Sequence, residues 1–381
     1  MLRDSTEKED VEKKLLKKMA AIVPLDQQAM EKAVDRWNSI GKPIHSLGLL
    51  EDAIVRMAGI QGTDAVRMDK KAIVVMCADN GVVREGVTQT GSQVTRIVAD
   101  NIACGDATVD IMANKAGADV FVVDIGMDCE EYPQKELCTG KVIDRKIRRG
   151  SGDIALEPAM TCQECMQALL TGMEIAQTLK EKGYHVIGTG EMGIGNTTPA
   201  SALASILDNV PAENVTGKGA GLTEEGLRHK IGIVEKAVNR YWDAAGEIAD
   251  DDLFRFHTGV ELLAQVGSLE IAGMAGLCLG GAASGLTVIL DGFISAAAAL
   301  AAILISTSQA CGDYLLASHV SAEPGGKRVI SQLHVSPVID AGMCLGEGTG
   351  AAAAMSLYEM ALEVYRSMKT FEEINVTPYK A

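Results

Sequence analysis

The stretch YHVIGTGEMG, residues 184–193, joins a short apolar run to a glycine-rich end that carries an acidic residue. Three other stretches share this pattern of strand-length apolar residues followed by an acid with glycine close by: AIVVMCADNG (72–81), ADVFVVDIG (118–126) and GLTVILDG (285–292). Helix-like segments lie between the four stretches, such as residues 166–182, which Gly183 closes as a C-cap residue. Continuous apolar strands that alternate with helices predict an α/β fold with a mostly parallel sheet covered on both faces.

The acidic strand ends predict where a ligand binds. In open parallel sheets, ligands bind beyond the carboxyl ends of the strands, so several acid–glycine endings suggest one shared site. For any single one of these acids, the alternative is that it only caps a turn.

The loop TGEMGIGNTT, residues 189–198, nearly matches a phosphate-binding P-loop. From Gly190 it reads G-x-x-x-x-G, but Asn196 stands where the lysine belongs, before Thr197, and Glu191 adds a carboxylate. A triphosphate would meet repulsion with too little positive charge, which disfavours a kinase or ATPase. The alternative for the glycines is that they serve only a tight turn.

The residues after this loop predict a helix start. Thr198 is expected as the N-cap and Pro199 as the first helical residue. A strand, a glycine loop and a helix in this order leave backbone N–H groups free to hold an anion.

Two further glycine-rich loops lead into helices. TGKGAGLTEEGLRHK (216–230) carries Lys230, and CLGEGTGAAAAM (344–355) places Glu347 between glycines. A carboxylate in such a frame is a plausible general base, because desolvation raises its proton affinity. The alternative for Glu347 is a charge that pairs with the helix dipole.

Composition narrows the classes of partner. The 381 residues carry a formal net charge of −16, which argues against binding to nucleic acid or to an anionic membrane. Residues 271–290 contain no charge, but their glycines and the TVIL before Asp291 predict a buried helix, a turn and a strand rather than a membrane span. No membrane association is therefore expected.

The cysteines predict neither disulfides nor a metal site. There are nine, an odd number at scattered positions, and no secretory signal opens the chain, so reduced thiols and a cytoplasmic location are expected. Cys162 and Cys165 form a lone pair without a second pair or a nearby histidine, whereas zinc sites normally have four ligands.

Nine stretches, in this order along the chain, resemble one known family. They are RWNSIGKPIHSLGLLED (36–52), VVMCADNGVVREGVTQ (74–89), EPAMT (157–161), GTGEMGIGNTTPASAL (188–203), GKGAGL (217–222), EIAGMAG (270–276), VILDGFISAAAALAA (288–302), SHVSAEPG (318–325) and LGEGTGAA (345–352). The chain thereby resembles the nicotinate-nucleotide–dimethylbenzimidazole phosphoribosyltransferases. These enzymes transfer the phosphoribosyl group of nicotinate mononucleotide to a benzimidazole nitrogen, in the assembly of the cobamide nucleotide loop.

The resemblance implies an overall organisation. It implies a Rossmann-like α/β phosphoribosyltransferase domain over residues 66–354. The charged, amphipathic residues 1–20 themselves predict a leader that is a peripheral helix or a frayed tail. A small helical domain is expected over residues 21–65, and in one alternative residues 355–381 belong to it as well. The resemblance also implies a homodimer, and no cofactor is expected.

The resemblance implies roles for individual residues. Glu347 would be the proton acceptor, and Glu191 would lie close to the base and the ribose and face Glu347 across the substrates. Gly219, Ser321 and Lys230 would hold the phosphate. The substrate-binding residues expected in full are Asp79, Thr88 and Gln89 beside the aromatic base, Gly193, Asn196 and Thr197 in the near-P-loop, Gly219, Lys230, Ser321 and Gly346.

Departures from the family pattern leave the acceptor base open. Asn80 stands where the family commonly has histidine, Gly91 replaces part of an aromatic–proline pair, and Cys344 stands where a basic residue often precedes LGEG. Another benzimidazole, adenine or a phenol remains an alternative acceptor. A non-catalytic protein that binds a nucleotide or a benzimidazole is the alternative from another class, which Glu347 argues against because pure binding needs no base.

Overall fold

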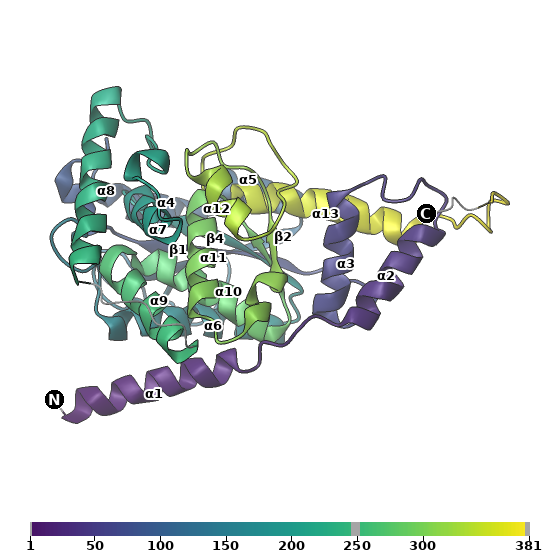
Figure 1. The fold of residues 1–381 in the computed structure, drawn as a ribbon, viewed down its shortest axis with the longest axis horizontal. Coiled ribbons are helices and arrows are strands. Elements are labelled where there is room, and N and C mark those ends of the chain that lie inside the picture. Colours follow the sequence, from purple (N-terminus) through teal and green to yellow (C-terminus); the bar gives the residue numbers. More distant parts are fainter. Residues whose placement is uncertain (1, 245–251, 378–381) are drawn as a thin grey trace.

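A computed structural model describes residues 2–244 and 252–377, which form a sheet flanked by helices and a helical extension (Figure 1). The strands are β1 (Lys71–Ala78), β2 (Ala118–Gly126), β3 (Val142–Asp144), β4 (Val186–Met192), β5 (Thr287–Leu290) and β6 (Leu315–Ala317). The helices of the first half are α1 (Leu2–Met19), α2 (Gln27–Ser39), α3 (Leu49–Gln61), α4 (Gln93–Ala103), α5 (Thr108–Lys115) and α6 (Cys162–Glu181). Those of the second half are α7 (Thr197–Leu207), α8 (Glu224–Ala244), α9 (Asp252–Val266), α10 (Leu269–Ser284), α11 (Phe293–Ile305), α12 (Gly326–Gln332) and α13 (Thr349–Ser367).

The six strands form one parallel sheet in the order β3-β2-β1-β4-β5-β6. The chain builds outward from β1 to β3, then crosses back so that β4 pairs with the other side of β1. This is the strand order of doubly wound dinucleotide-binding folds, and it creates a switch point between β1 and β4. The predicted α/β fold with a parallel, helix-covered sheet is confirmed.

The sheet separates two apolar cores. Ile73, Val75 and Cys77 of β1 pack with α3, α4, α5 and α13, whereas the alternating residues Val74 and Met76 face α6, α10 and α11 on the other side. All eight residues of β1 are buried, because both faces of the central strand are covered. This double burial explains why the strand has a continuous apolar run.

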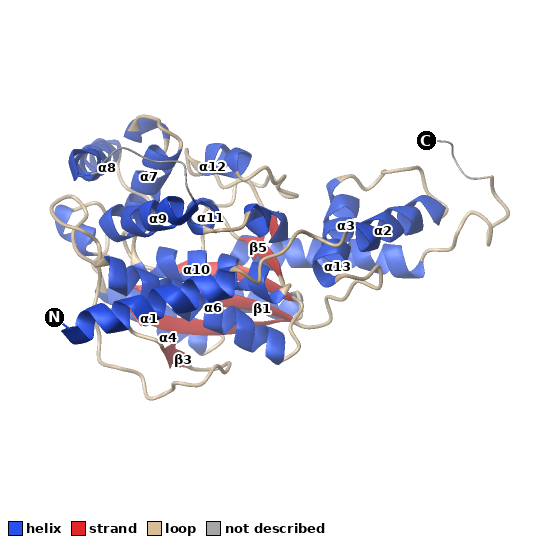
Figure 2. Ribbon diagram, turned by 60° about the horizontal axis from the view of Figure 1, so that its bottom comes forward, coloured by secondary structure: helices blue, strands red, loops and turns tan. Residues whose placement is uncertain are grey.

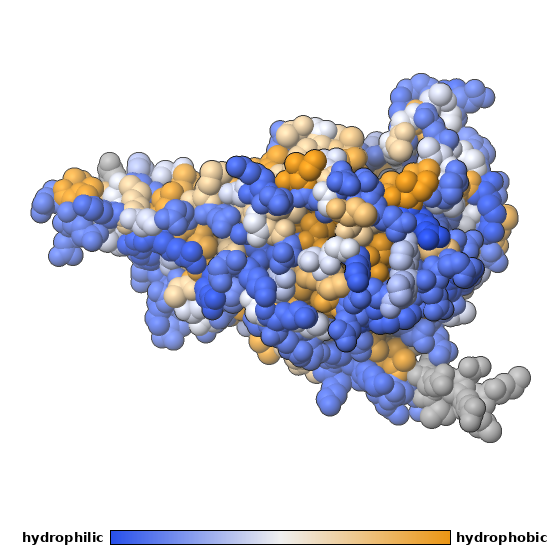
Figure 3. Space-filling model, turned by 180° about the vertical axis from the view of Figure 1, so that it is seen from behind, coloured by the Kyte–Doolittle hydropathy of each residue, from blue (hydrophilic) through white to orange (hydrophobic). Residues whose placement is uncertain are grey.

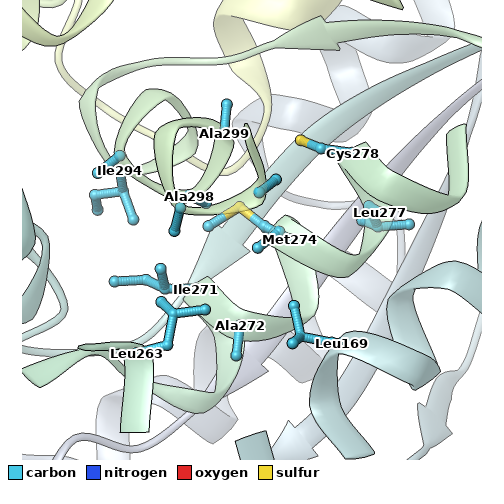
Figure 4. Close-up of a cluster of buried hydrophobic side chains, with 14 of the residues drawn as sticks. Leu169, Leu263, Ile271, Ala272, Met274, Leu277, Cys278, Ile294, Ala298 and Ala299 are labelled. Carbon is cyan, nitrogen blue, oxygen red and sulfur yellow. The ribbon is translucent and has the colours of Figure 1, made fainter. Parts of the chain in front are cut away.

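Helix α10 is the centre of the larger core. Figure 4 shows Ile271, Met274 and Leu277 of α10 among side chains of α6, α9 and α11. Its glycines allow close packing, since a Cβ at Gly276 would overlap the carbonyl oxygen of Leu169 in α6. At its end Gly285, with φ 64°, closes the helix before β5 begins. The uncharged stretch 271–290 is therefore a buried helix, a turn and a strand, as predicted, and none of the helices described is both long and apolar enough to cross a membrane.

Helices α2 and α3 pack against the C-terminal part of α13 and extend from one end of the sheet (Figure 2). The rings of Trp37 and Tyr365 meet edge to face with centroids 5.1 Å apart, and Arg36 Nε donates to the Tyr365 carbonyl oxygen at 2.9 Å. The beginning of α13 lies at the sheet edge, so one continuous helix links this extension to the loops beyond the strands. That the extension is a separate small domain stays a prediction.

The first helix lies on the outside of the larger core. Leu15 and Met19 of α1 are fully buried, and α1 contacts α6 and α10. Lys18 Nζ also donates to Gln177 Oε1 of α6 at 2.5 Å. The charged leader expected over residues 1–20 is thus a helix that packs along the surface.

Candidate active site

A cleft of about 270 Å³ lies at the carboxyl edge of the sheet, where loops after β1, β4, β5 and β6 converge. It is adjacent to the switch point between β1 and β4, where ligands bind in open α/β sheets. The lining comprises residues 87–90, 191–197, 218–220, Leu222, Lys230, 291–295, His319, Ser321, Glu323 and 344–347. These segments include all the predicted site residues except Asp79, which lies outside the lining.

Glu191, near the end of β4, is buried at the base of the cleft. Asn196 Nδ2 donates a short hydrogen bond to Glu191 Oε2, and a Cβ at Gly346 would overlap Glu191 Oε1. Burial raises the pKa of Glu191 to about 8, and the nearby charge of Asp291 acts in the same direction. Gly346, with φ 89°, is required here because any side chain would displace this carboxyl group.

The loop of Glu347 holds three consecutive residues in the left-handed region. Gly346, Glu347 and Gly348 have φ values of 89°, 63° and 97°. Such a conformation is uncommon for a residue other than glycine and often occurs at functional sites. The half-buried Glu347 carboxyl group has one buried oxygen, Oε2, without a hydrogen-bond partner among the described residues. Burial raises the pKa of Glu347, and the charges of Asp110 and Asp291 raise it as well.

Asp291, directly after β5, holds the Glu347 loop in place through hydrogen bonds to its backbone. Its Oδ1 accepts the backbone N–H of Gly350 at 2.6 Å, and its Oδ2 accepts that of Gly348 at 3.1 Å. These N–H groups lie at the beginning of α13, where a helix has unpaired donors and a carboxylate is favourable. Burial raises the pKa of Asp291, while the neighbouring His319 lowers it. The carboxylate therefore fixes the geometry of the loop that carries Glu347.

Lys230, inside α8, reaches the opposite part of the cleft. Only 1% of its surface is exposed, and its Nζ donates to Thr197 Oγ1 at 2.7 Å and to the Gly217 carbonyl oxygen at 3.1 Å. Burial lowers the pKa of Lys230 to about 8, whereas the charge of Glu323 raises it. A cation beside the N-terminus of α7 and a glycine loop is an arrangement suited to an anion.

Gln89 and Thr88 form the side of the cleft that follows β1. Gln89 Nε2 donates a short hydrogen bond to the Gly221 carbonyl oxygen and so bridges two cleft loops. Thr88 Oγ1 donates to the Thr90 carbonyl oxygen at 2.7 Å. Both residues line the cleft, and the Gln89 bond ties this segment to the glycine loop.

Behind the cleft lies a layer of buried polar groups. Asp79 Oδ2 accepts the backbone N–H of Asp128 at 2.7 Å, so this carboxylate braces the loop after β2. Asn80 Nδ2 donates to Glu270 Oε1 at 2.8 Å, and burial raises the pKa of the fully buried Glu270 to about 7. A Cβ at Gly193 would lie 2.8 Å from Glu270 Oε1, so only glycine fits between this layer and the cleft.

One detail of the prediction is wrong and another stays a prediction. The loops of Glu191 and Glu347 are in contact, since a Cβ at Gly190 would lie 2.6 Å from the Glu347 carbonyl oxygen. Both residues line the cleft, and that their carboxyl groups face each other across the substrates stays a prediction. The helix after the near-P-loop begins at Thr197, with Asn196 as its N-cap, and not at Pro199. Helix boundaries commonly shift by one or two residues, and here Asn196 already lies in the right-handed helical region.

Sequence reasoning assigned no individual role to Asp291, Glu270 or Glu323. A signal existed for Asp291, which ends one of the four acid–glycine strands. Glu270 and Glu323 lie within the motifs EIAGMAG and SHVSAEPG, but their contacts depend on segments distant in the chain. Only the folded structure brings Asp291 and Glu323 to the cleft and Glu270 to the polar layer behind it.

The cysteines do not assemble into a metal site in the part of the chain that the structure describes. None of the nine is in a disulfide, and the described residues contain no group of three or more His, Cys, Asp or Glu side chains placed to hold a metal ion.

Comparison with known proteins places the chain in one family. A family model described as "Phosphoribosyltransferase" matches residues 22–376. Two curated relatives carry the name nicotinate-nucleotide–dimethylbenzimidazole phosphoribosyltransferase. The protein from Acetivibrio thermocellus is 41% identical over 96% of this chain and 99% of its own, and that from Ruminiclostridium cellulolyticum is 43% identical over 94% and 97%.

The fold agrees with this assignment. A crystal structure of CobT from Thermus thermophilus superposes with a TM-score of 0.83 at 36% identity, covering 92% of this chain and all of that one. The chain therefore belongs to the nicotinate-nucleotide–dimethylbenzimidazole phosphoribosyltransferase family, a family of transferases in cobalamin biosynthesis.

Proposed function

We propose that this protein transfers the phosphoribosyl group of nicotinate mononucleotide to 5,6-dimethylbenzimidazole or a related base, releasing nicotinate and forming α-ribazole 5′-phosphate. The bond between the anomeric carbon and the pyridinium nitrogen breaks, and a bond from that carbon to the incoming nitrogen forms. Nicotinate leaves as a neutral ring nitrogen, so its departure needs no general acid. The proton on the other nitrogen of the acceptor must be removed.

Glu347 is the proton acceptor in this proposal. The observation that carries it is the buried Oε2 atom without a partner among the described residues, in a carboxyl group whose pKa is raised. A desolvated carboxylate with raised proton affinity is a suitable general base. Asp291 acts through Glu347, since it holds the N–H groups of the loop that follows this residue.

The phosphate of the nucleotide binds at the other end of the cleft. Lys230 supplies a buried positive charge, and Thr197, Gly219 and Ser321 supply groups around it. Thr88 and Gln89 border the base, and Glu191 lies beneath the ribose, with Gly193 and Gly346 keeping the backbone close to the substrates. Holding both substrates in line supplies much of the rate, as in effectively intramolecular reactions.

Several finer statements also belong to this proposal. The family resemblance favours a homodimer, and nine scattered cysteines without a disulfide favour a cytoplasmic protein. Velocity sedimentation of the purified protein measures the oligomeric state. Competition among dimethylbenzimidazole, hydroxy- and methoxybenzimidazoles, adenine and phenol identifies the acceptor.

Release of nicotinate from the mononucleotide, with and without dimethylbenzimidazole, tests the reaction. Glu347→Gln is expected to lower kcat about 100-fold or more, because a general base contributes that order of rate, with little change in KM. Glu363→Gln is the matched control, since this exposed glutamate lies in α13, the helix that follows the Glu347 loop, and outside the cleft lining. Unchanged turnover in Glu347→Gln would refute the assigned base. Tight binding of both substrates without any nicotinate release would favour a non-catalytic binding protein.

A further inference from the structure

The Glu323 side chain reaches into the part of the cleft assigned to the phosphate. Glu323 lies in the loop between β6 and α12 and lines the cleft together with Gly219, Lys230 and Ser321. A Cβ at Gly217 would overlap Glu323 Oε2, so the carboxylate rests directly on the glycine loop. A residue that is itself negative thus occupies a place where a negative substrate group is expected.

The contacts of Glu323 are those that a phosphate oxygen would use. Burial raises the pKa of Glu323, whereas the positive charge of Lys230 and the backbone N–H of Gly219 lower it, so these two groups favour the ionised carboxylate. Ser321 Oγ accepts the backbone N–H of Glu323 at 3.3 Å, which holds the acidic residue against the same subsite. A glycine-loop N–H together with a buried ammonium group is a general anion-binding arrangement.

The ammonium group of Lys230 explains why an internal anion is useful. With 1% of its surface exposed, Lys230 hydrogen-bonds to the uncharged oxygens of Thr197 and Gly217. A buried charge without a counterion is costly, and burial indeed lowers the pKa of this lysine. The carboxylate of Glu323 offsets this cost while no substrate is bound.

We propose that Glu323 is the resident anion of the phosphate subsite, which the nucleotide phosphate must displace from Gly219 and Lys230 in order to bind. This inference rests on the proposed function, because it takes the phosphate-binding end of the cleft from it. Because the carboxylate must be displaced, a ligand binds here only if it replaces the contacts that Glu323 gives up. A phosphomonoester has three terminal oxygens and about two negative charges, so it replaces every contact of one carboxylate and adds Ser321. A neutral nucleoside replaces none of them.

The competition lowers the apparent affinity for any phosphate. When a binding-competent state is only fractionally populated, the apparent dissociation constant rises by the inverse of that fraction. Glu323→Gln keeps the shape of the side chain but removes its charge, so it weakens the internal competitor. The variant is therefore expected to bind phosphate more tightly than the wild-type protein.

Calorimetric titration of the full-length protein with inorganic phosphate tests the inference. Glu323→Gln is expected to lower the dissociation constant for phosphate about five-fold or more, and to lower KM for nicotinate mononucleotide in parallel. Glu224→Gln is the matched control. Glu224 is an exposed acid paired with Lys218 of the same glycine loop at 2.6 Å, so the variant removes one charge nearby without entering the subsite. Its dissociation constant should stay within about two-fold of the wild-type value.

The opposite result identifies a supporting role instead. Equal or weaker phosphate binding by Glu323→Gln, in a variant that melts at the wild-type temperature, would overturn the inference. If Glu323→Gln melts at a lower temperature, Glu323→Asp gives the second comparison: the shorter carboxylate should also bind phosphate more tightly, and weaker binding again overturns the inference. The titration requires no turnover. Tighter phosphate binding in a protein that releases no nicotinate would support Glu323 as the resident anion and refute the proposed reaction.

Discussion

The pKa values of two cleft residues, Glu347 and Lys230, are shifted toward each other. Burial raises the pKa of Glu347 above its ordinary value and lowers the pKa of Lys230 to about 8. The base must be ionised, so activity falls as the pH decreases through the pKa of Glu347. The lysine must be protonated to attract the phosphate, so activity falls again as the pH rises beyond about 8. We expect kcat/KM for nicotinate mononucleotide to follow a bell-shaped curve, measured as initial rates of nicotinate release.

Two variants can identify the group whose titration causes the loss of activity at high pH, the alkaline limb of the curve. Glu191 also titrates near pH 8, because burial raises its pKa to about 8, so its ionisation would contribute a limb at the same position. Lys230→Arg keeps its charge at high pH and should move the limb upward, whereas Glu191→Gln should leave it in place. A limb that stays in Lys230→Arg and disappears in Glu191→Gln would show that the lysine is not the titrating group.

Single residues were predictable where glycines frame them and not where contacts are long-range. The motifs GEMGIGN and LGEGTG pointed to Glu191 and Glu347, and both lie at the cleft. Their mutual orientation depends on how closely the two loops approach, which sequence spacing does not encode. Asp79 was expected beside the aromatic base of the substrate. Its carboxylate instead accepts the backbone N–H of Asp128, which the loop after β2 supplies.

At the scale of elements, glycines allow α6 and α10 to pack in direct backbone contact. A Cβ at Gly276 would overlap the Leu169 carbonyl oxygen, and backbone cannot swing aside as a side chain does. Gly276→Ala should therefore push the two helices apart and lower the free energy of unfolding by about 1–3 kcal/mol. Denaturant titration followed by circular dichroism measures this change.

Gly232 provides the matched helix control. It lies within α8, where an added Cβ would meet no atom within 4 Å. Gly232→Ala should raise the free energy of unfolding by up to about 1 kcal/mol, since alanine loses less backbone entropy in a helix. If both variants gained stability, the close packing of α6 and α10 would not be a constraint in solution.

Elements with long apolar runs were predicted, and the shortest ones were not. The four acid–glycine stretches became β1, β2, β4 and β5. The strands β3 and β6, with three residues each, are too short for periodicity to distinguish them from loop residues. Their place at the two edges follows from pairing with β2 and β5, which is tertiary information.

At the scale of the whole molecule, the class of fold followed from the sequence, but the arrangement of its parts did not. Alternating apolar strands and helices predict a parallel sheet, whereas the reversal of strand order that creates the cleft depends on crossover connections. The face shown in Figure 3 is largely hydrophilic with separate apolar patches, in keeping with the formal charge of −16. The net charge therefore agrees with the polar surface, whereas composition does not predict which helices pack against one another.

The N-terminal helix gives a prediction for the whole molecule. Helix α1 contributes no residue to the cleft lining and precedes the segment matched by the family model, but its Leu15 and Met19 side chains are fully buried. Removal of residues 1–20 should lower the free energy of unfolding by about 2–4 kcal/mol, because two large apolar side chains lose their burial while the helix no longer has to be ordered. The values of kcat and KM should stay within about two-fold of those of the full chain, since the cleft loops keep their contacts.

The combined variant Leu15→Ala and Met19→Ala separates packing from the presence of the helix. It should reproduce most of the stability loss with the leader still attached, because it removes the buried side chains and leaves the charged face unchanged. Thermal melts and steady-state assays on the same preparations measure both quantities. A truncated protein with unchanged stability would show that α1 does not pack on α6 and α10 in solution. One with unchanged stability and greatly reduced kcat would instead show that the leader takes part in the reaction.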